Sequence, residues 1–98
     1  MNARKITIPV SQLRNAVSDL IGYVEPLDGV HYLPVVAVLG GGAIDIIDGY
    51  HRIAGLIRGG AEAIDCVTCD DIDLLAAAAS DSRSEQQAAT SAIYAALR

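Results

Sequence analysis

The residues best suited to chemistry are the five that run from Asp48 to Arg52, Asp-Gly-Tyr-His-Arg. They follow an apolar run and precede residues at helical spacing, so they would lie at the N-terminus of a helix. The first turn of a helix carries N–H groups without backbone partners and the positive end of the helix dipole. Cationic side chains such as His51 and Arg52 are unfavourable there by about 0.3–1 kcal/mol each unless an anion binds. The pattern therefore predicts an anion site.

A purely structural interpretation of the same residues stays open. Arg52 could pair with the carboxylate of Asp48 or of Asp45, and His51 could be an ordinary surface histidine. Helix N-termini that could bind an anion are common, and many have no ligand. The spacing alone does not separate these two interpretations.

An apolar strand before the site and an amphipathic helix after it must position these residues. The strand is indicated by β-branched residues that end at Asp48-Gly49, a turn pair whose carboxylate could cap the next helix. These strand residues are Ile44, Ile46 and Ile47. The helix is indicated by apolar residues at i, i+3 and i+4, namely Ile53, Leu56 and Ile57. Gly59-Gly60 would end this helix in a left-handed turn.

The first part of the chain predicts a strand followed by a helix. Alternating apolar residues at 6, 8 and 10 indicate a short strand, and Pro9 places it at a sheet edge because proline cannot donate to a ladder. A helix should open at Ser11 and end at Pro26. Its apolar stripe consists of Leu13, Val17, Leu20, Ile21 and Val24.

The middle of the chain predicts a hairpin inside the sheet. Residues 33–39 are apolar on both alternating faces, which is typical of a central strand covered on both sides. Gly40-Gly41-Gly42 favours a tight turn over a phosphate loop because no helix starts after it. A return strand over 43–48, the helix, and a further strand over 63–68 then suggest a crossover unit.

The C-terminal part predicts two helices. Asp70 or Asp71 could cap the first, whose apolar residues lie between 72 and 79. Ser84-Glu85-Gln86-Gln87 matches a capping box for the second. The narrow apolar face of that Ala-rich last helix consists of Ala89, Ile93, Ala96 and Leu97. This face could pack on the domain itself, on a second copy in a homodimer, or on another protein.

The bulk properties bound the class of protein. A chain of 98 residues has the length of a single domain and can bury a core without a metal or a disulfide. Its net charge of −5 argues against a protein that binds duplex DNA through its overall field. No run reaches the length of a membrane span, and no signal-peptide apolar region opens the chain, so we expect a cytoplasmic protein without membrane contact. Cys66 and Cys69 have too few companions for a zinc site, and structural thiols are favoured over a redox or metal role.

Taken together, this order of elements resembles the ParB/sulfiredoxin-like superfamily, which includes the ParB N-terminal and ParB-like nuclease domains. The motif that carries the resemblance runs from Asp48 to Gly55, Asp-Gly-Tyr-His-Arg-Ile-Ala-Gly. Gly49, Arg52 and the small pair Ala54-Gly55 stand where chromosome-partition proteins have Gly-Glu-Arg-Arg-x-x-Ala. Gly29 and Pro34 ahead of an apolar strand also fit the family. The resemblance covers about residues 4–75.

The resemblance implies an α+β fold, a small mixed sheet with packed helices, as a single domain over 1–98 with a helical extension over about 71–98. It also implies a site that holds nucleotide phosphates, CTP in partition proteins and ATP or ADP in other members, with Mg²⁺ as a companion. By position, the nucleotide would be held by Gly29, Pro34, Gly49, Tyr50, His51 and Arg52. His51 and Asp48 would be the catalytic pair, and Asp45 and Asp48 could hold the metal.

Departures from the family pattern leave three functions in competition. Tyr50 stands where sulfiredoxin has its reactive cysteine, which excludes sulfinic-acid reduction by this residue. The third motif of partition proteins is only weakly echoed by residues 80–87. The favoured function is a nucleotide-binding domain, for which weak NTPase or phosphotransferase activity is an option. The alternatives are a non-enzymatic protein-interaction module and a metal-dependent DNA nuclease, the latter disfavoured by the acidic charge.

Overall fold

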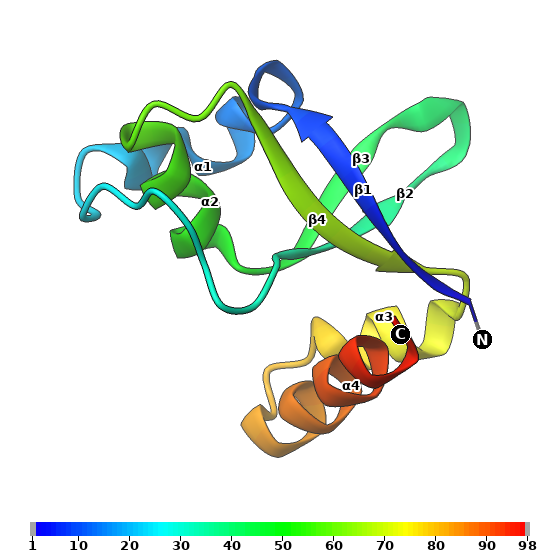
Figure 1. Cartoon of the computed structure of the whole chain (residues 1–98). Coiled ribbons are helices and arrows are strands. Elements are labelled where there is room, and N and C mark those ends of the chain that lie inside the picture. The colour runs from blue at the N-terminus through cyan, green and yellow to red at the C-terminus, as the bar shows by residue number, and fades with distance from the viewer. Residues whose placement is uncertain (1, 98) are drawn as a thin grey trace.

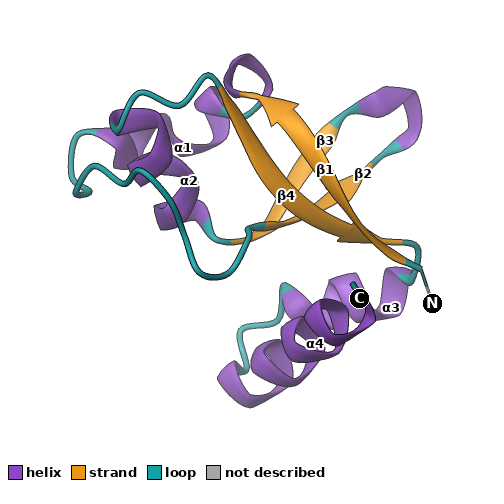
Figure 2. Ribbon diagram, in the orientation of Figure 1, coloured by secondary structure: helices purple, strands orange, loops and turns teal. Residues whose placement is uncertain are grey.

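The computed structural model describes residues 2–97 and has an α+β architecture in which helices cover both faces of one mixed sheet (Figures 1 and 2). The strands are β1 (Ala3–Pro9), β2 (Val35–Val38), β3 (Ile44–Asp48) and β4 (Ala63–Cys69). The helices are α1 (Arg14–Ile21), α2 (Tyr50–Arg58), α3 (Ile72–Ala78) and α4 (Arg83–Ala96). The α+β prediction from the sequence is confirmed.

The sheet has the strand order β1-β4-β2-β3, so β1 and β3 are its edges. β1 pairs antiparallel with β4 along its whole length, and its edge position agrees with the expectation from Pro9. β2 and β3 form the predicted antiparallel hairpin. The three-glycine turn between them holds Gly41 and Gly42 at φ +80° and +85°, values that side chains rarely adopt.

The connection from β3 through α2 to β4 differs from the crossover that the sequence predicts. β2 lies between β3 and β4, and it is antiparallel to β3 but parallel to β4. The strands on either side of α2 are therefore antiparallel. The hairpin reverses the chain before α2, so the parallel pair that the crossover joins is β2 and β4 instead.

Two apolar clusters lie on opposite faces of the sheet. The first packs α1 and α2 on the sheet and includes Leu13, Val17, Ile46, Ile53 and Cys66. The second packs α3 and α4 on the other face and includes Val35, Val67, Leu75, Ala89 and Ile93. β2 contributes to both clusters, as expected of a strand covered on both sides. Cys66 and Cys69 also divide between the faces, and both thiols are free and buried.

The first helix is shorter at both ends than predicted. A 3₁₀ turn over Val10–Gln12 precedes it, and it ends at Ile21 instead of continuing to Pro26. The chain leaves the helix early because the segment that follows packs on α2, where the N–H of Leu27 donates to the carbonyl of Gly55 at 2.8 Å. Val24, the last residue of the predicted apolar stripe, lies beyond the end of the helix but still packs against the first cluster.

The two C-terminal helices begin with side-chain caps. Asp71 accepts from the N–H of Leu74 at 3.1 Å and caps α3, one of the two predicted choices. The cap of α4 is Ser82, which accepts from the N–H of Glu85, so the prediction of a box starting at Ser84 is wrong by two positions. The same Ser-x-x-Glu spacing fits Ser82 and Glu85. Among the described residues, no helix is long and apolar enough to span a membrane.

Candidate functional site

The junction of β3 and α2 depends on the backbone of Gly49. Its φ of +98° lies in the left-handed region, and it is the N-cap of α2. A Cβ at this position would lie 3.0 Å from the Cβ of Pro34, so the chain passes close to that buried proline. Because Gly49 is the N-cap, the carboxylate of Asp48 lies one position too early to cap the helix. The predicted cap by Asp48 is wrong, and α2 has no side-chain cap.

The start of α2 borders a shallow hollow of about 430 Å³. The first intrahelical bond joins the N–H of Ile53 to the carbonyl of Gly49 at 2.9 Å. The N–H groups of Tyr50, His51 and Arg52 therefore have no intrahelical partner. The hollow is lined by Leu20, Asp48, Gly49, Tyr50, His51 and Arg52. The five residues that the sequence singled out thus border one depression, with the side chain of His51 exposed beside it.

Arg52 connects three separate parts of the chain. Its Nη2 pairs with Oδ2 of Asp48 at 3.1 Å, while its Nη1 donates to the carbonyl of Tyr32 at 2.8 Å. The same Nη1 donates at 3.4 Å to the hydroxyl of Tyr94 on α4, which in turn donates to the carbonyl of Leu33. The structural interpretation of the sequence included this ion pair between Arg52 and Asp48, as the alternative to an anion site. Arg52 therefore holds the loop before β2, the start of α2 and α4 together.

A second hollow, of about 440 Å³, lies between the start of α2 and α4. Each residue that lines it carries a polar group: Tyr32, Asp48, Arg52, Gln87, Thr90, Ser91 and Tyr94. The rings of Tyr32 and Tyr94 lie with their centroids 5.4 Å apart and tilted by 45°. Asp48 and Arg52 line both hollows, so the two form adjacent parts of one site.

Tyr32, Tyr94 and Gln86 were missed by reasoning from the sequence. Gln86 lies 3.5 Å from Oδ1 of Asp48 through its Nε2. The only signal for Tyr94 is that it is a large polar aromatic residue in an Ala-rich helix. These residues come from positions 20 to 42 away from Arg52, where local spacing carries no information.

Of the other residues predicted for the site, some lie at the junction of β3 and α2 and others lie away from it. Tyr50 lies at the junction, but its hydroxyl donates to the carbonyl of Ile46 at 2.8 Å, so the phenol is anchored to β3. Pro34 is buried against Gly49. Gly29 lies in the exposed loop before β2 and lines neither hollow at the junction. Only Pro34 of the pair Gly29 and Pro34 therefore contacts the junction.

The two carboxylates predicted to hold a metal lie in different surroundings. Asp48 lines the hollows at the start of α2, whereas Asp45 lines a hollow beside α3. Within residues 2–97, His, Cys, Asp and Glu side chains form no group of three that could hold a metal ion. The geometry leaves Asp48 as the carboxylate beside the helix N-terminus, already paired with Arg52.

Comparisons of the chain with models of protein families, with curated proteins and with solved structures found no match. The resemblance to the ParB/sulfiredoxin-like superfamily therefore stays a prediction. It rests on the short motif from Asp48 to Gly55 and on the order of the elements around it.

Proposed function

We propose that this protein is a nucleotide-binding domain that holds phosphate oxygens at the start of α2. The observation that carries the proposal is the group of three N–H donors of Tyr50, His51 and Arg52, which have no intrahelical partner and belong to residues that line an open hollow. Gly49 lines the same hollow, and its left-handed backbone, which glycine adopts most readily, sets the start of the helix there. The exposed imidazole of His51 adds a donor at the same place.

In this proposal Arg52 both stabilises the fold and binds phosphate. Three hydrogen bonds within the chain fix its guanidinium, which has five N–H groups in total. The remaining groups can donate to phosphate, and its fixed position reduces the entropy lost on binding. A substitution of Arg52 would disturb the fold as well as the ligand, so it is a poor test of binding.

The adjacent hollow supports a nucleotide over a bare phosphate. Tyr32 is 65% exposed and borders the second hollow, which shares Asp48 and Arg52 with the hollow at the helix start. An exposed aromatic ring can stack on a base, and the hydroxyl and amide groups around it can bond a ribose. CTP and ATP, with Mg²⁺ near the carboxylate of Asp48, are the ligands to examine first.

The test is thermal unfolding of the full chain with CTP, ATP, GTP, ADP or orthophosphate, each with and without Mg²⁺. A ligand at a hundredfold excess over its Kd stabilises by about 2.7 kcal/mol, which for a domain of this size raises Tm by about 10 °C or more. We expect one nucleotide to raise Tm more than orthophosphate does. Release of phosphate from that nucleotide then measures whether the site turns over.

The matched variants use the two exposed histidines. His51→Ala should reduce the nucleotide shift, whereas His31→Ala, in the loop before β2, should retain it. No shift with any nucleotide at millimolar concentration contradicts the proposal and favours a protein-interaction module. Equal shifts in both variants would contradict the role of the α2 N-terminus.

A further inference from the structure

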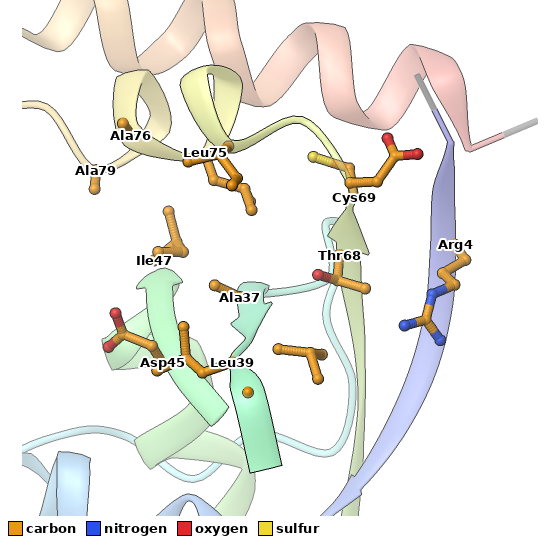
Figure 3. A pocket seen from close by; sticks show the side chains of 14 residues that line it. Arg4, Ala37, Leu39, Asp45, Ile47, Thr68, Cys69, Leu75, Ala76 and Ala79 are labelled. Carbon is orange, nitrogen blue, oxygen red and sulfur yellow. The ribbon is translucent and has the colours of Figure 1, made fainter. Parts of the chain in front are cut away.

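A hollow of about 750 Å³ lies between the sheet and α3, away from the start of α2 (Figure 3). Its walls come from the ends of β2 and β4, from β3, from Arg4 of β1 and from α3. Most of the lining is apolar, with Ile47, Leu75 and Ala76 among the residues that border it in Figure 3. Three large apolar residues around it are exposed, Val38 at 42%, Leu39 at 50% and Ile72 at 80%.

This hollow opens where the two central strands separate. β2 and β4 pair only at Val35 and Val67, although β2 continues to Val38 and β4 to Cys69. Figures 1 and 2 show the β2–β3 hairpin leaving the β1–β4 pair at a wide angle. Within the described part of the chain, the sheet is thus continuous at one end and split at the other.

Main-chain groups on both sides of the split lack strand partners. The N–H of Leu39 donates to the carbonyl of Ala43 across the hairpin, so by alternation the N–H and C=O of Val38 point away from β3 and toward β4. On the other side, the N–H of Val67 donates to the carbonyl of Pro34 across the joint. Cys69, two positions on, faces the same way, beyond the last β2–β4 pair.

We infer that this split is a docking site for an extended peptide, which would add to β2 as a strand along its free edge. Main-chain donors and acceptors at strand spacing match another strand, and the apolar lining offers contacts for alternate side chains. Two carboxylates, of Asp45 and Asp70, and one guanidinium, of Arg4, border the hollow, and the chain carries a net charge of −5. The peptide should therefore combine apolar residues with a Lys or Arg.

The test uses a randomised heptapeptide library displayed on phage and selected on the full chain. We expect enriched sequences that alternate apolar residues and carry Lys or Arg. The best sequence, synthesised with a fluorescent label, should bind the wild type in an anisotropy titration. N-methylation of the amides that pair with β2 should weaken it about tenfold or more, since each lost main-chain hydrogen bond costs about 0.5–1.5 kcal/mol. Selection that enriches no sequence above an uncoated surface overturns the proposal.

Two variants test the site from the protein side. Val38→Pro removes the N–H that faces the split without removing a β2–β3 bond, and it should weaken the peptide about tenfold, while Val38→Ala keeps that N–H and should bind more tightly than Val38→Pro. Ala76→Leu fills the hollow from α3 and should also weaken binding, while His31→Ala, in the exposed loop before β2, should leave it unchanged. Binding equal to wild type in both Val38→Pro and Ala76→Leu overturns the proposal. A wild-type dimer that Val38→Pro dissociates would assign the split to a second copy and overturn it too.

Discussion

Gly49 is the residue on which the geometry of the helix start depends most directly. Its left-handed backbone is unfavourable for an L side chain by about 1–2 kcal/mol, and a Cβ would also press on Pro34 at 3.0 Å. Gly60 offers a matched control, because its φ of +99° is almost the same and a Cβ there meets nothing within 4 Å. The two glycines therefore separate backbone strain from steric contact.

We expect Gly49→Ala to lower the free energy of unfolding more than Gly60→Ala does. Both should lose the strain energy of about 1–2 kcal/mol, and Gly49→Ala should lose more because Pro34 is buried and must move. Urea denaturation followed by far-UV circular dichroism measures the difference. Equal losses would mean that the loop carrying Pro34 yields without cost.

The thiol of Cys66 should make stability depend on pH in the alkaline range. Its burial, with a smaller contribution from the charge of Asp65, raises its pKa from 9.0 to about 11. Below about pH 9 the thiol is protonated in both the folded and the unfolded chain, so its full contribution is present. Above that pH the unfolded thiol ionises first, and stability falls until the folded thiol also ionises near pH 11.

The expected loss between pH 9 and 11 is about 2–3 kcal/mol, from the relation between pKa and free energy. Urea denaturation of the wild type and of Cys66→Ala across this range measures it. The variant should be less stable at pH 7 but should show a shallower fall with pH, because other groups are common to both proteins. Parallel pH profiles would contradict this prediction.

Local sequence could predict part of the candidate site but not the residues that complete it. The run from Asp48 to Arg52 is contiguous, so a prediction of where the strand ends and the helix begins was enough to locate these residues at the helix start. The carbonyl of Tyr32 and the hydroxyl of Tyr94 reach Arg52 only because the loop and α4 fold over the start of α2. Such contacts depend on tertiary packing, and the periodicity of apolar residues in a sequence carries no information about them.

At the scale of elements, α2 is packed through its glycines against the chain that leaves α1. A Cβ at Gly59 would lie 2.0 Å from the carbonyl oxygen of Leu27, and a Cβ at Gly55 would lie 2.8 Å from the Cδ1 of the same residue. The N–H of Leu27 also bonds to the carbonyl of Gly55. This side of the helix can therefore carry no side chain without displacing that segment.

We expect Gly59→Ala to destabilise the protein by about 3 kcal/mol or more, although its φ of −75° is ordinary and alanine favours helices. The atom in the way is backbone, which cannot rotate aside. Gly22→Ala is the control, because it also ends a helix at φ −77° and meets nothing within 4 Å. Thermal unfolding should show a large drop in Tm for Gly59→Ala and little change for Gly22→Ala. Similar values for the two would show that the segment at Leu27 moves freely.

The elements that sequence predicted well are those with strong local signals. The glycine-rich hairpin, the edge strand with Pro9 and the Asp71 cap each follow from the chemistry of one or a few residues. The errors occurred where tertiary packing overrides a local pattern, as at the end of α1, or where two capping patterns overlap, as at Ser82 and Ser84. The direction of β4 relative to β3 depends on the insertion of β2 between them, and no local signal encodes it.

At the scale of the whole molecule, one sheet supports two cores. Leu13 lies in the cluster under α1 and α2, and Ile93 lies in the cluster under α3 and α4. Both side chains are almost fully buried, at 1% and 0% exposed. Because β2 and β4 contribute to both clusters, loss of one core should weaken the other.

We expect Leu13→Ala and Ile93→Ala each to destabilise the protein by about 2–5 kcal/mol while unfolding stays a single transition. Tyrosine fluorescence and far-UV circular dichroism, recorded in the same urea titration, should give coincident midpoints for both variants. Two separate transitions in either variant would show that the helical C-terminal part folds independently of the sheet.

The pairing of β1 with β4 has a consequence for the order of events during synthesis and folding. The hydroxyl of Thr7 on β1 donates to the carboxylate of Asp65 on β4, 58 positions away, and just beyond these strands the N–H of Asn2 donates to the carboxylate of Asp70, 68 positions away. Closing so long a loop costs entropy before any contact is gained, and folds dominated by distant pairings are slow to form. β1 leaves the ribosome before β4 and must therefore wait for it, and the hairpin and α2, which need only near neighbours, can form in the interval.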